Sequence, residues 1–162
     1  KLIVPAVPAL RERIVQAAQA AGLGGVVQIV SGQSHAVLAA CDTTLIASGT
    51  ATLEAALFKR PMVIGYHMHP LSWWLMRRKQ LQPWVGLPNI LCGDFVVPEL
   101  IQDAATPQAL CAATLQWLDA RQHHPEKITA LEQRFTALHE SLRRNTPQLA
   151  ADAIQKILHP AA

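Results

Sequence analysis

Hydroxyl groups, a glycine and an acid follow one another closely in the middle of the chain, in the stretch SGTATLE. Ser48, Gly49, Thr50 and Thr52 lie where an apolar, strand-forming run passes into residues that favour a helix. The first amides of a helix have no partner within the helix, and its dipole favours an anion at this end. Glycine allows the backbone to approach a ligand closely. These residues therefore predict a phosphate site, with the hydroxyl groups as additional donors.

Glu54 lies too far into the predicted helix to cap its first turn. In dinucleotide-binding folds an acid near the phosphate turn accepts hydrogen bonds from the ribose hydroxyls, and Glu54 is a candidate for the same task. A simpler interpretation fits the local pattern equally well. Ser48 or Thr50 is then only an N-cap, and Glu54 is only a solvated helix residue. The local sequence leaves both interpretations open.

Composition limits the classes of protein that fit. The chain has 162 residues, of which 51% are hydrophobic and 15% charged, so we expect one folded domain with a core and not a disordered chain. No signal peptide is visible and no apolar run has the length of a membrane span, although a chain that starts without Met is expected to be a piece of a longer protein. The net charge of +3 suits an anionic ligand or an anionic membrane, and is too small to predict nucleic-acid binding.

The three cysteines lack the spacing of a metal or redox motif, so we expect reduced thiols at Cys41, Cys92 and Cys111.

The elements around the turn alternate between strands and helices. Apolar runs predict buried strands at residues 2–4, 26–30, 44–47 and 61–66, with helical patterns between them. This alternation predicts an α/β fold with a parallel sheet covered by helices on both faces. Further along, we expect a short strand or ordered loop at 85–91, a short helix from Pro98, and helices at 107–120, 125–144 and 146–158. The final third is therefore predicted to be helical.

Three motifs occur in a specific order and spacing, namely SGTATLEAALFKRPMVIGY, LPNIL and PELIQ. They resemble the lipid-A-disaccharide synthase family, glycosyltransferases that join two acylated glucosamines, and the resemblance covers most of the chain. The family has two Rossmann-like domains of the GT-B type facing a cleft, and the second domain binds most of the nucleotide-sugar donor. The resemblance implies that residues 1–121 form this UDP-sugar-binding domain without its amino-terminal part. Residues 122–162 would then form helices that pack on the domain, on the partner domain or on a second subunit.

The resemblance also assigns site residues. It implies that the UDP diphosphate is held by Ser48, Gly49, Thr50 and Thr52. Glu54 lies seven positions before Pro61, where related glycosyltransferases place a ribose-binding glutamate, so it is assigned to the ribose. Polar positions near the donor pocket are matched by Asn89, Glu99 and Gln102. Tyr66 is added to this pocket because it ends a predicted strand, where ligands of open α/β sheets bind.

The reaction that the resemblance implies is transfer of 2,3-diacylglucosamine from UDP to the 6-hydroxyl of 2,3-diacylglucosamine 1-phosphate (lipid X), giving the lipid A disaccharide and UDP. The family's LPGSR-like loop and its first domain, where the base is expected, are missing. We therefore assign no catalytic residue here and expect this piece alone to be inactive. No Asp-x-Asp pair is present, so we expect neither a metal nor another cofactor. The expected location is peripheral, at the cytoplasmic face of the bacterial inner membrane.

Two features leave alternatives open. Trp73 and Trp74 precede a basic triplet, Arg77 to Lys79, and the segment fits either contact with an anionic membrane or packing of one tryptophan in the core. Other functions also remain. A different UDP-sugar enzyme, such as an epimerase, would share the turn and Glu54, but we would not expect it to carry LPNIL and PELIQ. A non-catalytic dimerisation module is supported by the helical final third, whose helices could also join two subunits of the transferase.

Overall fold

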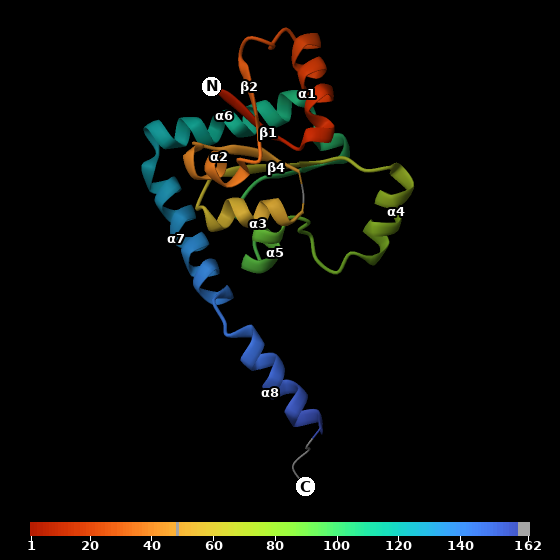
Figure 1. Cartoon of the computed structure of the whole chain (residues 1–162), viewed down its shortest axis with the longest axis vertical. Coiled ribbons are helices and arrows are strands. Elements are labelled where there is room, and N and C mark those ends of the chain that lie inside the picture. Colours follow the sequence, from red (N-terminus) through yellow and green to blue (C-terminus); the bar gives the residue numbers. More distant parts are fainter. Residues whose placement is uncertain (48, 159–162) are drawn as a thin grey trace.

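The computed structural model describes residues 1–47 and 49–158 (Figure 1). Ser48, one of the predicted diphosphate ligands, lies outside the described residues. The elements follow in the order β1 Leu2–Ala6, α1 Pro8–Ala20, β2 Val27–Ser31, α2 Ser34–Ala40, β3 Thr44–Ile46, α3 Thr50–Leu57, β4 Met62–Tyr66, α4 Pro70–Lys79, α5 Leu87–Cys92, β5 Glu99–Ile101, the 3-10 turn η1 Gln102–Ala104, α6 Pro107–His123, α7 Pro125–Leu142 and α8 Thr146–Leu158.

The described strands form two parallel sheets, which confirms the predicted α/β class. β1 pairs with β2, and the second sheet has the order β3-β4-β5. In that second sheet Ile46 lies beside Ile64, and Tyr66 lies beside Ile101. Because all three strands run the same way, their carboxyl ends meet at one edge, which also carries the start of α3. The strands that were expected in one sheet are thus divided between two.

Helices cover both faces of the three-stranded sheet, with α6 on one side and α3 and α5 on the other (Figure 1). On the α6 side, the indole Nε1 of Trp117 donates to the carbonyl of Met62 at 3.0 Å. A Cβ at Gly65 would lie 2.8 Å from Cδ2 of Leu110, so glycine is what allows α6 to approach the central strand this closely.

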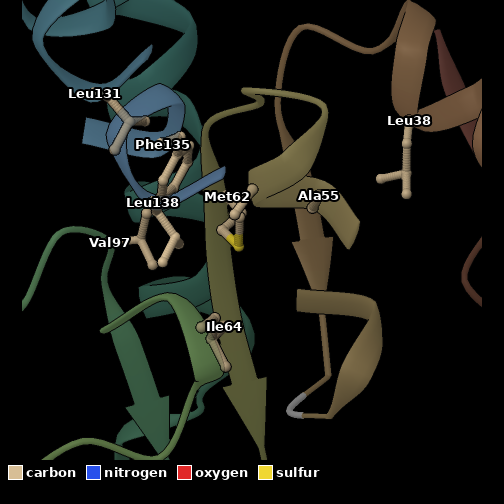
Figure 2. Close-up of a cluster of buried hydrophobic side chains, with 9 residues drawn as sticks. Leu38, Ala55, Met62, Ile64, Val97, Leu131, Phe135 and Leu138 are labelled. Carbon is tan, nitrogen blue, oxygen red and sulfur yellow. The ribbon is translucent and has the colours of Figure 1, made fainter. Parts of the chain in front are cut away.

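The core lies between the sheet and α3, α5 and α7 (Figure 2). Met62, Ile64 and Phe135 are fully buried in it. Each side chain of this size contributes about 1.5–3 kcal/mol when it is removed from water. The remaining members come from several elements and are Leu38, Ala55, Ala56, Val97, Leu131 and Leu138. The core thus holds α3, which carries the predicted phosphate turn, against the sheet edge.

The last two helices differ in how they meet this body. In α7 the residues at helical spacing are buried, namely Ile128, Leu131, Phe135 and Leu138. α8 has no buried residue and extends away from the sheets (Figure 1). The boundary predicted after residue 121 lies within the last turn of α6, and α7 packs in the core through Leu131, Phe135 and Leu138. None of the helices in the described part of the chain is long and apolar enough to cross a membrane.

Two local predictions were wrong. The stretch expected as a strand or loop at 85–91 contains α5, in which Pro88 occupies a first-turn position that tolerates proline. The stretch expected as a helix from Pro98 instead forms β5, which pairs with β4 from Ile64 to Tyr66. Pairing with an existing strand supplies hydrogen bonds that a three-residue segment cannot make alone, so tertiary context decides this element.

The first strand was also predicted to be buried, and it is mostly exposed. Leu2 is 51% exposed and Ile3 39% exposed, while Ala6 is the buried residue of β1. β1 has one neighbouring strand, β2, so a parallel pair replaces the expected interior position in a larger sheet.

Candidate functional site

The turn between β3 and α3 has a conformation that depends on glycine. Gly49 has φ 140° and ψ −168°, a region populated almost only by glycine, and it is the N-cap of α3. Gly49 and Thr50 are exposed, as is Ala51 in the first turn. A Cβ built on Gly49 would meet no atom within 4 Å. The start of α3, Gly49 to Ala51, is therefore exposed at the carboxyl end of β3, as an anion site requires.

Thr52 has a different place from the one predicted. Its side chain is fully buried, and its Oγ1 donates to the carbonyl of Gly49 at 2.7 Å. The Thr52 amide donates to the same carbonyl at 3.1 Å. Because the Thr52 hydroxyl is buried and already donates to the Gly49 carbonyl, it stabilises the turn and is not available as a donor to a diphosphate. Direct contact by Thr52, which we expected from the sequence, is corrected to a role in holding Gly49.

Glu54 lies near the same edge, one turn further along α3. Its side chain is 43% exposed, and its Oε2 lies 3.4 Å from Nε2 of His35. The ring of His35 is tilted against that of Phe58, with 5.7 Å between the ring centroids. The carboxylate of Glu54 can therefore be reached from solvent while a neighbouring imidazole limits its orientation.

His35 was not singled out from the sequence. It lies in the first turn of α2, four residues after the end of β2. The available signal was its position, because a polar residue just beyond a parallel strand lies at the edge where ligands of such sheets bind. Nothing in the local sequence indicated that this residue would meet Glu54.

Tyr66 and Gln102 lie at the ends of neighbouring strands. Tyr66 is the last residue of β4 and pairs with Ile101, which immediately precedes Gln102. The Gln102 side-chain amide accepts from the Met68 amide at 2.6 Å and donates to the Met68 carbonyl at 3.0 Å. These two bonds hold Gln102 at a φ of 55°, which is uncommon for a residue with a side chain. Gln102 thus fixes the loop that follows Tyr66, and its amide is committed to that task.

Asn89 and Glu99 form a buried network instead of an open pocket wall. Asn89 is fully buried; its Oδ1 accepts from the amides of Val96 and Val97, and its Nδ2 donates to the Val97 carbonyl and to Glu99 Oε1 at 2.8 Å. All the hydrogen-bonding capacity of the Asn89 amide is used. Asn89, which was predicted near the donor pocket, therefore has a structural role in this fold.

Glu99 has a similar role. Its carboxylate accepts from the amide of Val85 at 2.9 Å and from that of Gly86 at 2.8 Å. A Cβ on Gly86 would overlap Ile64 and crowd the Glu99 carboxylate, so this position needs glycine. The two motifs LPNIL and PELIQ thus bind each other, and Glu99 also holds the backbone just before α5.

Neither Cys41 nor Cys92 is an activated thiol. Burial raises the pKa of Cys92 and that of Cys41, so both thiols are protonated at neutral pH. The hydrogen bond from Arg134 lowers the pKa of Asp94, and the 2.8 Å ion pair joins α7 to the residues after α5. Within residues 1–47 and 49–158 no three acidic, histidine or cysteine side chains cluster as they would around a metal.

Gly49 and Thr50 at the start of α3 and Tyr66 at the end of β4 thus lie at the carboxyl edge of the second sheet, and Glu54 lies one turn further along α3. Thr52, Asn89, Glu99 and Gln102 hold the surrounding backbone. Open helix amides with a reachable carboxylate beside them can receive a phosphate group and a sugar diol.

The model of the lipid-A-disaccharide synthetase family matches residues 1–154. The lipid-A-disaccharide synthase of Verminephrobacter eiseniae is 81% identical over 158 residues, which is 98% of this chain and 41% of that relative. The enzyme of the same name from Albidiferax ferrireducens is 71% identical over the same length and coverage, and that of Thiobacillus denitrificans is 52% identical over 163 residues. The chain spans about two fifths of the length of these relatives. Because the family match covers all but the last eight residues, the chain belongs to the lipid-A-disaccharide synthetase family.

Proposed function

We propose that this chain is the donor-binding half of a glycosyltransferase that moves 2,3-diacylglucosamine from UDP to the 6-hydroxyl of lipid X, releasing UDP. The observation that carries the proposal is the open turn at Gly49, where the exposed residues Gly49 to Ala51 begin α3 at the carboxyl end of β3. Membership of the family, whose named members are lipid-A-disaccharide synthases, supports this substrate class. The other half, with the acceptor site and the base, corresponds to the part of the relatives that this chain does not cover.

In the proposed complex each group has one task. The amides of Gly49 and Thr50 receive the diphosphate, with the Thr50 hydroxyl as a further donor and Ser48 as a predicted one. Glu54 accepts from the two ribose hydroxyls, and Tyr66 borders the sugar at the end of β4. Thr52 and Gln102 act indirectly, because their hydrogen bonds to Gly49 and Met68 fix the two loops that face the ligand.

The proposed reaction is a direct displacement at the anomeric carbon. The acceptor 6-hydroxyl forms the new bond as the bond to the UDP oxygen breaks, and negative charge grows on the leaving diphosphate. Amides that already point at this position stabilise the charge without reorganising, which is where electrostatic catalysis is strongest. In this proposal the helix amides take the place that a divalent cation has in metal-dependent transferases.

Titration of UDP into the full-length protein tests this assignment. Here full-length means this chain together with the remainder present in its relatives. We expect saturable binding of one UDP per chain in calorimetry, competition by pyrophosphate, and no change when a chelator of divalent cations is added. A protein that serves only as an interaction module would show no saturable UDP binding. Binding that disappears with the chelator would contradict the metal-free diphosphate site.

The exposed helix α8 favours a further element of the proposal, a homodimer joined through the carboxyl-terminal helices. Its apolar side chains meet no core in this structure, and Leu149, Ile154 and Ile157 are 52%, 57% and 79% exposed. An amphipathic helix of this kind gains stability only when another surface covers its apolar face.

We predict that Ile154→Ser with Ile157→Ser weakens dimerisation of the full-length protein by about tenfold or more, since each buried isoleucine contributes about 1.5–3 kcal/mol. Light scattering across a dilution series measures the change. The pair Leu71→Ser and Leu75→Ser on α4 is the control for general loss of exposed apolar side chains. An unmodified full-length protein that is monomeric at all concentrations would exclude this interface.

The proposed location is the cytoplasmic face of the inner membrane, as a peripheral protein. A substrate that carries acyl chains is delivered most directly at a membrane surface, and the structure shows no membrane-spanning helix among its described residues.

A further inference from the structure

The helix α4 carries an apolar face that the α/β body does not cover. Leu71, Trp74 and Leu75 follow one another at helical spacing and are 66%, 50% and 50% exposed. Trp73 and Met76 point the other way and are half-buried. Figure 1 shows α4 standing apart from the sheets, and no residue of the helix is buried. A helix on the surface of a soluble protein normally has the opposite arrangement, with its outward face polar.

Three basic residues, Arg77 to Lys79, form the last turn of α4. Arg78 lies one turn after Trp74 and two turns after Leu71, and its guanidinium lies 3.9 Å from the centroid of the Trp74 ring. Arg77 lies over Trp73 at 6.0 Å, and Lys79 follows. α4 contains no acidic residue, and within the described chain its three basic side chains form no ion pair. Leu81, just beyond the helix, is 99% exposed.

We propose that the outer face of α4, formed by Leu71, Trp74, Leu75 and Arg78, docks on an anionic lipid bilayer. The apolar side chains would enter the boundary between headgroups and acyl chains, and tryptophan is well suited to that boundary. The basic residues would remain at headgroup level, where an anionic surface attracts each of them. Arginine stacked on tryptophan keeps its charge at this depth while covering the ring.

Charge and position favour a bilayer over a protein partner. A protein-binding groove would need complementary acids opposite three unpaired cations, whereas an anionic membrane supplies negative charge in any orientation. α4 also begins four residues after Tyr66, and the intervening loop is held by Gln102, which directly follows β5. Docking α4 would therefore bring the ligand edge of the sheet close to the membrane. This inference rests on the peripheral location proposed above and adds the surface that makes the contact, and it does not depend on which nucleotide sugar binds.

Flotation with lipid vesicles tests the docking surface in the full-length protein. We expect the protein to float with vesicles that contain phosphatidylglycerol and to remain behind with pure phosphatidylcholine. The variant Arg77→Gln with Arg78→Gln should weaken binding about tenfold or more, as should Leu71→Ser with Leu75→Ser. The matched controls are Arg143→Gln with Arg144→Gln, and Leu115→Ser with Leu118→Ser on α6, all at exposed positions. Both controls should bind as the unmodified protein does.

Two results would overturn the proposal. One is equal flotation of the α4 variants and their controls. The other concerns amide exchange of α4 in the absence of vesicles. If α4 is strongly protected in the full-length protein and loses this protection when the amino-terminal half is removed, that half covers α4 and the docking surface is not free. UDP titration of each variant separates the docking surface from the nucleotide site. Unchanged UDP affinity with lost flotation supports the docking surface, and normal flotation of the α4 variants contradicts it whatever their UDP affinity.

Discussion

Replacing Gly49 by valine in the full-length protein is expected to lower its affinity for UDP by about a hundredfold or more. Gly49 has φ 140° and ψ −168°, which a β-branched residue adopts only at a cost of about 1–3 kcal/mol. The backbone would relax away from this geometry, and the exposed amides of the α3 first turn would no longer converge on one point. The space that a Cβ would occupy is open, so the valine side chain itself would stand in the proposed diphosphate position. Calorimetric titration with UDP measures the loss.

A matched glycine separates this local effect from general strain. Gly22 also has a positive φ, 70°, and a Cβ there would meet no atom within 4 Å, but it lies after α1 and far from the α3 turn in the chain. We expect Gly22→Val to lower the stability of the protein in denaturant unfolding without changing its affinity for UDP. A folded Gly49→Val protein that binds UDP as tightly as the unmodified one would remove the turn from the site.

The glycine turn was predictable because its chemistry is local. A strand-forming run, a glycine and a helix-forming run follow one another within fewer than fifteen residues, and each preference acts on its own segment. The parallel α/β class was predictable for the same reason, since apolar runs alternate with helical patterns. The resemblance to a family added the ligand, which no local preference contains.

The roles of the other polar residues depend on partners that are distant in the sequence, and these roles were not predictable. The local pattern shows that Asn89 and Glu99 are polar, but only the fold shows that they bind each other at 2.8 Å. The local sequence predicts Thr52 as an exposed donor, but in the folded chain its side chain is completely buried. The short strand β5 exists only because β4 lies beside it. In each case a contact made by tertiary packing overrides the local preference.

Replacing Glu54 by alanine is expected to weaken UDP binding by about tenfold to a hundredfold, while binding of pyrophosphate changes little. A carboxylate that accepts hydrogen bonds from a ligand contributes about 1.5–3 kcal/mol, and pyrophosphate has no ribose from which Glu54 could accept. The half-exposed Glu54 side chain beside the Gly49 turn is placed for such a contact. Calorimetry with the two ligands on the same protein gives both affinities.

A deoxy nucleotide makes the test specific for the ribose. In the unmodified protein we expect 2′-deoxy-UDP to bind more weakly than UDP, because the Glu54 carboxylate loses one hydroxyl partner. In Glu54→Ala the two nucleotides should bind equally, so the two losses do not add. His35→Ala is the matched control: it removes the 3.4 Å neighbour of Glu54 but leaves the carboxylate, and should retain most of the discrimination between the two nucleotides. Equal losses of UDP and pyrophosphate in Glu54→Ala would instead mean that Glu54 supports the turn and does not bind the ribose.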